Sequence, residues 1–294
     1  MTNLEEYLDR HPKETKRLIG IDEIQFQDLL IMVQKLHEEK QGSRPRLIRA
    51  GGGRRRSLSV KQELLLTLVY LHQYPTFQFL GIQFGVSEST ANDIFHYWVN
   101  ILQERLPASL MEQIKKKEDE WSWIEEILSE QELIVDSSQQ YRERPQNPQE
   151  QKKHYSGYKG GHTFKNQLII TEDGREIVDV VVGYPGPIND LKLWESQRDK
   201  FSASQKFQGD AGYIGEVTIS APHKKPKKGK LTPTQKEENY DKARRRIRVE
   251  HMIRLGKIFR VASERFRLSP RHYQSVISLI FGLVRYRIGN LILT

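Results

Sequence analysis

Phe207-Gln-Gly-Asp-Ala-Gly-Tyr-Ile214 carries one acid, Asp210, between two glycines at the end of a short apolar run. Two other acids stand in comparable settings. Asp136 closes the apolar run Leu133-Ile-Val-Asp136, and Glu250 lies in the arginine-rich segment Arg244-Arg-Arg-Ile-Arg-Val-Glu-His251. These patterns predict an acid at the end of each of two strands and a third acid on a later helix.

The 294 residues have room for one large domain or two smaller ones. There are 47 Lys and Arg against 38 Asp and Glu, a formal net charge of +9. Much of the positive charge gathers in three segments, 44–56, 223–230 and 242–248. Clustered cations are typical of proteins that bind a polyanion. Three such segments around the candidate acids favour a nucleic-acid partner over the alternative of a basic surface that contacts only solvent.

The chain contains no cysteine, which excludes disulfides, thiolate zinc sites and a cysteine nucleophile. No apolar run reaches the roughly 18 residues of a membrane span. The start, Met1-Thr-Asn-Leu-Glu-Glu6, is acidic and polar, unlike a signal peptide. We therefore expect a cytoplasmic protein.

The first part of the chain has the spacing of amphipathic helices, over about 22–40 and 60–73, and the second of these is ended by Tyr74-Pro75. Between them, residues 41–57 are rich in Gly and Arg and have no periodicity. This segment, with Arg54, Arg55 and Arg56 at its end, is predicted to be a basic linker along a phosphate backbone.

A helix-turn-helix is predicted within residues 60–103. A short helix stops at Gly85, and Ser87 is a good N-cap for a further helix to about residue 103. Two helices joined by a Gly-containing turn are typical of this motif, with the second helix facing DNA. Simple helix packing is the alternative. On the first interpretation Ser89, Thr90 and Asn92 contact DNA.

The pattern changes to strands after about residue 125. Residues 167–171 and 177–182 predict a hairpin, and 207–210 predict a further strand. Asp190 is expected to be the N-cap of one helix, and Thr234 the cap of a long helix to about residue 260. The fold class is therefore α/β, a mixed central sheet with flanking helices over 126–294, preceded by an all-α domain over 1–125.

Three carboxylates on two strand ends and a helix suit phosphoryl transfer by two metal ions, because one carboxylate must bridge both ions. Each acid also has an ordinary explanation. Asp136 could cap a turn, Asp210 could be a loop residue, and Glu250 could pair with Arg246 and Arg254 along a helix. Their order and flanking residues together favour the metal site.

Several further motifs accompany these acids in order: Ile134-Val-Asp136, Tyr155-Ser-Gly-Tyr-Lys-Gly-Gly-His-Thr-Phe-Lys165, Pro185-Gly-Pro-Ile-Asn-Asp190, Gly209-Asp-Ala-Gly-Tyr213 and Arg246-Ile-Arg-Val-Glu-His251. On these residues the chain resembles bacterial insertion-sequence transposases of the DDE superfamily endonuclease type, related to Harbinger transposases, over nearly its whole length. The resemblance implies an N-terminal helix-turn-helix domain and a ribonuclease-H-like catalytic core. It places the acidic triad on Asp136, Asp210 and Glu250, with Asp190 as a supporting acid.

The resemblance also implies the reaction: cleavage at transposon ends and transfer of the 3′-OH into target DNA, with two Mg²⁺ or Mn²⁺ ions in each site. DNA is the expected partner, bound by a homodimer or larger assembly in the bacterial cytosol. The family often has Gly-Thr-Glu after the first Asp, where this chain has Ser137-Ser138-Gln139. Beyond the residues named for the helix-turn-helix and linker, the predicted DNA contacts are Lys159, His162, Lys165, Lys224, Lys225, Arg245, Arg246 and Arg254.

Three alternatives stay open from the sequence. A domesticated, inactive DNA-binding regulator would keep the basic segments but not the chemistry. A metal-dependent endonuclease would cut without strand transfer. A tyrosine recombinase would use Tyr273 or Tyr286 and form a Tyr–DNA bond without metal. Tyr273 fits the apolar side of the last predicted helix, which disfavours the recombinase.

Overall fold

The computed structural model describes residues 4–42, 57–115, 126 and 128–291. The chain forms two compact units. One comprises Met1–Leu106, Ile258–Val261 and Tyr286–Thr294, and the other comprises Pro107–Lys257 and Ala262–Arg285. The boundary predicted near residue 125 lies outside the described residues, as does nearly all of the predicted linker 41–57. The division into domains 1–125 and 126–294 therefore stays a prediction.

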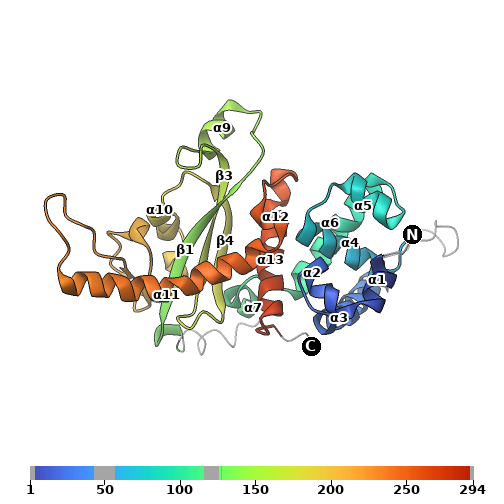
Figure 1. The fold of residues 1–294 in the computed structure, drawn as a ribbon, viewed down its shortest axis with the longest axis horizontal. Coiled ribbons are helices and arrows are strands. Elements are labelled where there is room, and N and C mark those ends of the chain that lie inside the picture. Colours follow the sequence, from blue (N-terminus) through green and yellow to red (C-terminus); the bar gives the residue numbers. More distant parts are fainter. Residues whose placement is uncertain (1–3, 43–56, 116–125, 127, 292–294) are drawn as a thin grey trace. The chain divides into compact units, whose positions relative to one another are not determined.

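The described helices of the first unit are α1 (Leu4–Arg10), α2 (Thr15–Ile19), α3 (Glu23–Gly42), α4 (Val60–Gln73), α5 (Phe77–Phe84) and α6 (Glu88–Arg105) (Figure 1). The helix predicted over 60–73 is confirmed, and it begins with a capping box made by Ser59 and Gln62. The side chains of Phe95 and Trp98 are fully buried, and the indole of Trp98 donates to Glu63 at 2.8 Å.

The pair of helices predicted around Gly85 is also confirmed. Gly85 ends α5 with a φ of 71°, in the left-handed region that favours glycine. The hydroxyl of Ser87 caps α6 by accepting from the backbone N–H of Thr90 at 3.1 Å. Two helices joined by a short, tightly capped turn are the core of a helix-turn-helix.

The second unit contains a mixed sheet (Figure 1). The strand order is β4-β3-β1-β5-β6, and the short β2 also pairs with β3. Strands β4, β3 and β1 run antiparallel, whereas β5 and β6 run parallel to β1. The strands are β1 (Glu132–Tyr141), β2 (Tyr155–Ser156), β3 (Gly161–Ile170), β4 (Ile177–Pro185), β5 (Lys206–Gln208) and β6 (Ile219–Ser220).

Helices flank this sheet, which bears out the mixed α/β class. They are α7 (Leu110–Ile114), α9 (Pro148–His154), α10 (Asp190–Glu195) and α11 (Pro233–Lys257). The short α12 (Arg260–Ser263) and α13 (Tyr273–Arg287) follow. The predicted hairpin is confirmed as β3 and β4, although β3 begins earlier than expected, at Gly161. Within the described residues, no helix is both long and apolar enough to cross a membrane.

Asp136 does not end a strand, so that part of the prediction is wrong. Strand β1 continues to Tyr141, because Asp136 to Tyr141 pair antiparallel with Leu168 to Thr163 of β3. Side chains alternate between the faces of a strand. Leu133 and Val135 enter a core with Trp194 and Phe207, and Asp136 points to the opposite face, where α11 lies against β1.

Two predicted helix caps are also wrong. Thr232 caps α11 in place of Thr234, with its hydroxyl accepting from the N–H of Gln235 at 3.2 Å, and Pro233 begins the helix. The cap of α10 is Asn189, which makes Asp190 the first helical residue. Neighbouring polar residues compete for the same role, and the final geometry of the preceding loop decides which one caps.

Candidate active site

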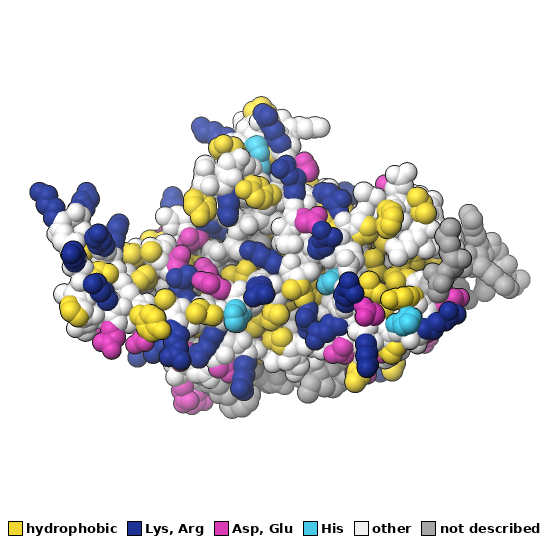
Figure 2. All heavy atoms as spheres, in the orientation of Figure 1, with side chains coloured by type: hydrophobic (Ala, Val, Ile, Leu, Met, Phe, Trp, Pro, Cys, Tyr) yellow, Lys and Arg dark blue, Asp and Glu magenta, His cyan; other side chains and the backbone are white. Residues whose placement is uncertain are grey.

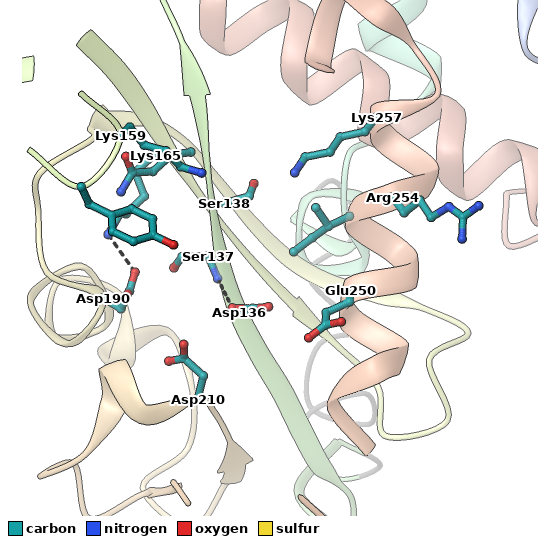
Figure 3. Close-up of a pocket in the computed structure, with 13 residues that line it drawn as sticks. Asp136, Ser137, Ser138, Lys159, Lys165, Asp190, Asp210, Glu250, Arg254 and Lys257 are labelled. Carbon is teal, nitrogen blue, oxygen red and sulfur yellow. Dashed lines mark hydrogen bonds and ion pairs between the residues drawn. The ribbon is translucent and has the colours of Figure 1, made fainter. Parts of the chain in front are cut away.

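The three predicted triad acids line one pocket, together with Asp190 (Figure 3). The pocket has a volume of about 620 Å³. Asp136 comes from the middle of β1, Asp210 from the residues after β5, and Glu250 from α11. Segments that are far apart in the sequence thus place their carboxylates at one pocket.

Asp136 is largely buried, with 15% of its side chain exposed. One carboxylate oxygen accepts from the N–H of Ser137 at 2.8 Å. Burial raises the pKa of Asp136 to about 6, and the nearby carboxylates of Asp210 and Glu250 add to the rise. The Ser137 N–H and the charge of Arg246 lower this pKa. Burial in the site therefore disfavours the ionised form of Asp136, and a cation bound nearby would favour it.

Asp210 is fixed by the backbone that follows it. It caps the 3-10 turn Ala211–Tyr213, and its Oδ1 accepts from the N–H of Gly212 at 2.8 Å. A Cβ at Gly212 would lie 2.8 Å from Oδ2 of Asp190 and 2.9 Å from Oδ1 of Asp210. Two carboxylates therefore converge over Gly212, at a position where only glycine leaves them room.

Lys165 holds Asp190. Its ammonium donates to Oδ1 of Asp190 at 2.9 Å and to the carbonyl of Ile188, and only 7% of the side chain is exposed. Burial of this kind requires a paired charge. Lys165 is predicted from the sequence to contact DNA. Its position favours a different contribution, because the positive charge offsets the crowding of Asp190 against Asp210.

Arg246 lies between two of the acids. Its Nη2 is 3.6 Å from Oε1 of Glu250 and 4.0 Å from Oδ2 of Asp136, and 22% of its side chain is exposed. The helical pair of Arg246 with Glu250, set out above as an ordinary explanation, is thus present, and Glu250 also lines the pocket. Glu250 keeps 57% of its side chain exposed, so its carboxylate remains accessible.

The three residues that depart from the family pattern, Ser137, Ser138 and Gln139, all line the pocket. The hydroxyl of Ser137 lies 3.0 Å from that of the buried Tyr213. Gln139 accepts from the hydroxyl of Thr163 at 3.0 Å. A neutral amide therefore stands in this wall of the pocket, where the resemblance leads us to expect a carboxylate.

The donor chemistry of the pocket fits a hard divalent cation, because carboxylate oxygens are the ligands that Mg²⁺ and Mn²⁺ prefer. In the arrangement described here, however, the described residues contain no group of three or more His, Asp or Glu side chains close enough to share one ion. The assignment of Asp136, Asp210 and Glu250 as metal ligands therefore stays a prediction.

Sequence reasoning missed part of the pocket. Lys257 lines it from α11, and Figure 3 shows its side chain directed toward β1, while the guanidinium of Arg254 points away from the acids. Lys257 follows Glu250 by seven residues, about two helical turns, so the helical period was an available signal. Tyr158 and Lys159 line the pocket from the turn before β3. Both belong to a motif quoted from the sequence, but only Lys159 is predicted from it as a DNA contact.

The described residues among the other predicted DNA contacts are not part of the lining of this pocket, and all of these contacts stay predictions. In α6, the hydroxyls of Ser89 and Thr90 lie 3.0 and 2.8 Å from that of Ser87, so both belong to the cap, and Asn92 is half-buried. Lys224 and Lys225 are exposed in the loop before α11, where Figure 2 shows Lys and Arg side chains gathered. His162 is half-buried beside Tyr155. Arg245 forms ion pairs with Glu132 and Glu172. Arg54, Arg55 and Arg56 lie outside the described residues.

The structure disfavours the tyrosine recombinase. Tyr273 is buried, its hydroxyl donates to Gln140 at 3.0 Å and accepts from Asn166 at 2.8 Å, and burial raises its pKa. The hydroxyl of Tyr286 donates to the carbonyl of Gln25 at 2.7 Å. A buried phenol with its hydrogen bonds satisfied is a poor nucleophile.

Two family models assign the chain to a class of endonuclease. Residues 135–285 match the DDE superfamily endonuclease, and residues 56–108 match the helix-turn-helix of DDE superfamily endonuclease. The chain belongs to the DDE superfamily endonuclease family, whose chemistry depends on divalent metal.

Its relatives include an insertion-sequence protein of Microchaete diplosiphon, named "Probable transposase for insertion sequence element IS702". The two are 32% identical over 94% of this chain and 95% of the relative. A protein of Streptomyces albus G, named "Putative transposase for insertion sequence element IS112", is 30% identical over 71% of this chain and 73% of its own length. Among solved structures, the Mos1 transposase paired-end complex with left transposon end is 13% identical over 65% of this chain and 66% of that chain, with a TM-score of 0.20, too slight a likeness to support an argument.

Proposed function

We propose that this chain is a DNA transposase that cuts the ends of its own insertion sequence and joins the freed 3′-OH to target DNA. The observation that carries the proposal is the shared pocket of Asp136, Asp210 and Glu250, in a chain of the DDE endonuclease family. The names of its relatives support the same function.

The catalytic unit is proposed to be ribonuclease-H-like. Its sheet order, three antiparallel strands β4-β3-β1 continued by the parallel β5 and β6, supports this. The central strand β1 carries Asp136, and the residues after the neighbouring β5 carry Asp210. A carboxylate on the rigid centre of a sheet is well placed for the precise geometry that an in-line displacement demands.

Asp136, Asp210 and Glu250 are proposed to hold two Mg²⁺ or Mn²⁺ ions. When bound, such ions activate the attacking oxygen and stabilise the leaving oxygen of the phosphodiester. The chain itself supplies positions and charge. Gly212 and Ser137 fix Asp210 and Asp136 through backbone N–H groups, and Lys165 holds Asp190 beside Asp210.

DNA is proposed to reach the pocket along its basic rim, where Lys159, Arg254 and Lys257 contact phosphates. Contacts of this kind supply affinity and orientation without choosing a sequence. The helix-turn-helix α5–α6 is proposed to recognise the element's terminal repeats. Two ends must be paired for insertion, so the active assembly is proposed to be a homodimer or larger.

The experiment uses a labelled duplex carrying the element's own end and an unlabelled target, with Mg²⁺ or with EDTA. We expect strand joining with Mg²⁺, none with EDTA, and none with Asp210→Asn. Cleavage without joining would indicate a metal-dependent endonuclease. Binding without cleavage in any divalent metal would indicate a regulator, and either result would overturn the proposal.

A further inference from the structure

Tyr158 is an exposed aromatic side chain at the rim of the acidic pocket. It stands in the turn between β2 and β3, with 89% of its surface exposed. It lines the same pocket as Asp136, Asp210 and Glu250. Single exposed aromatics are common on protein surfaces and require no explanation by themselves. This one lies beside the proposed catalytic acids, where a substrate would contact it.

The turn that carries Tyr158 is held in place by β1. The hydroxyl of Tyr141 donates to the carbonyl of Lys159 at 2.9 Å, and the N–H of Lys159 donates to the hydroxyl of Ser156 at 3.4 Å. The Tyr141 ring also packs closely on Gly161, where an added Cβ would lie 3.2 Å from it. The backbone on both sides of Tyr158 is thus fixed relative to the strand that carries Asp136.

The charges around Tyr158 match a nucleotide. The ammonium of Lys159 lies 5.3 Å from the centre of the Tyr158 ring, and Lys257 lines the same pocket from α11 with its side chain directed toward β1 (Figure 3). A flat apolar ring next to cations provides a face for a base and charges for its phosphates. Aromatic rings that accept any base by stacking, combined with cations along the backbone, are the usual means of holding unpaired nucleic acid.

We propose that Tyr158 stacks on an unpaired base of the strand being cut, next to the phosphodiester that is cleaved at the acidic pocket. In a duplex both faces of a base are covered by its neighbours, so the base must leave the stack to meet the ring. This inference rests on the proposed function. It adds that the DNA is locally opened at the cleavage site and that the chain holds one displaced base.

The test measures binding of an element-end duplex by the full chain carrying Asp210→Asn, so that the DNA stays intact. Tyr158→Ala is expected to weaken binding by about 5- to 150-fold, the range for losing one base–aromatic stack. Tyr158→Phe keeps the ring and is expected to bind like the parent. Tyr240→Ala, a matched change at a tyrosine that is 69% exposed on α11, is expected to have no effect.

An abasic scan identifies the base. Each nucleotide near the cleavage site is replaced in turn by an abasic one. The affinity for each DNA is then measured with the parent protein and with Tyr158→Ala. At one position, the loss of affinity caused by the abasic nucleotide and the loss caused by Tyr158→Ala are expected not to add, because either change removes the same contact. Additive losses at every position, or a loss with Tyr158→Phe equal to that with Tyr158→Ala, would overturn the stacking inference. Cleavage by the wild-type chain in parallel tests the proposed function separately.

Discussion

Asp136 shows how a single side chain couples burial to charge. Its carboxyl is largely buried, and burial raises its pKa to about 6 from an ordinary value near 3.8. The folded chain therefore binds this proton more tightly than the unfolded chain does. Between these two pKa values the folded state holds more protons, so its stability falls as pH rises. Above pH 6 the metal-free fold bears the full cost of the ionised carboxylate.

Asp136→Asn should relieve that cost. In EDTA at pH 8, we expect the variant to be more stable than the wild type by up to about 3 kcal/mol, the equivalent of the shift in pKa. The difference should vanish below about pH 3, where the wild-type carboxyl is protonated in both states. Urea unfolding from about pH 3 to pH 8 measures it. Asp199→Asn, at a side chain 97% exposed, is the control; a gain that does not depend on pH would contradict the explanation.

Gly212→Ala tests the convergence of Asp190 and Asp210. The new Cβ would meet a carboxylate oxygen of each at 2.8 and 2.9 Å, so both must move. Displacements of about 1 Å near reacting groups cost roughly 100-fold in rate, and we expect cleavage to fall by about that factor while the protein stays folded. Gly42→Ala, with nothing within 4 Å of its Cβ position, serves as the control. Unchanged cleavage by Gly212→Ala would mean that the exact placement of these carboxylates is unimportant.

At the scale of elements, sequence patterns predicted the helices and the hairpin that local interactions stabilise. The helix over 60–73, the capped pair around Gly85 and the β3–β4 hairpin each follow from spacing and turn chemistry, and the structure confirms them. The second half of β1 does not. Asp136-Ser-Ser-Gln-Gln-Tyr141 has no apolar alternation, and it is extended because it pairs with β3. Pairing with β3 therefore decides that these residues are extended, and no local stretch of the sequence shows that pairing.

The candidate site also has one part that the sequence predicts and another part that depends on the fold. The order and flanks of Asp136, Asp210 and Glu250 were enough to predict that they would line one site. The burial of Lys165 was not predictable, because the sequence shows a lysine in a polar stretch and only the fold supplies Asp190 as its partner. The place of Tyr158 at the rim likewise depends on how the β2–β3 turn is held by Tyr141.

Gly81→Ala tests the turn between α5 and α6. An alanine inside a helix normally stabilises it by about 1 kcal/mol relative to glycine. Here the Cβ would lie 2.7 Å from the carbonyl of Val86 and 3.2 Å from the carbonyl carbon of Ser87. Backbone atoms cannot easily give way, so we expect a loss of about 1–3 kcal/mol in stability, as for overpacked cores, and weaker DNA binding. Chemical unfolding and a binding titration measure both; Ile24→Ala, on α3 at a side chain 75% exposed, should change neither. Greater stability in Gly81→Ala would contradict the tight turn.

At the scale of the whole molecule, a formal charge of +9 makes DNA affinity depend on salt. The exposed lysines of the loop before α11 contribute to that charge without lying in the pocket. If they contact phosphates, they add affinity for any sequence equally.

Changing Lys224 and Lys225 together to alanine should reduce the slope of log affinity against log salt by about 1.8, or roughly 0.9 for each phosphate contact. Binding should weaken alike for element ends and unrelated DNA. Titrations at several salt concentrations give the slope. The charge-matched change of Lys152 and Lys153 to alanine, on α9, should leave the slope unaltered; an equal fall in both double variants would show a nonspecific effect of net charge.

The central claim is that the carboxylates of Asp136, Asp210 and Glu250 act together in cutting DNA. The most direct measurement is the rate of cleavage of a labelled element end in Mg²⁺ by Asp136→Asn, Asp210→Asn and Glu250→Gln, each shown to bind the DNA. Because residues that act as a unit are each indispensable, every variant should lose at least about 1,000-fold in rate, while Glu237→Gln, on the same helix as Glu250, should cut like the wild type. Near-normal cleavage by any one of the three variants would contradict the account.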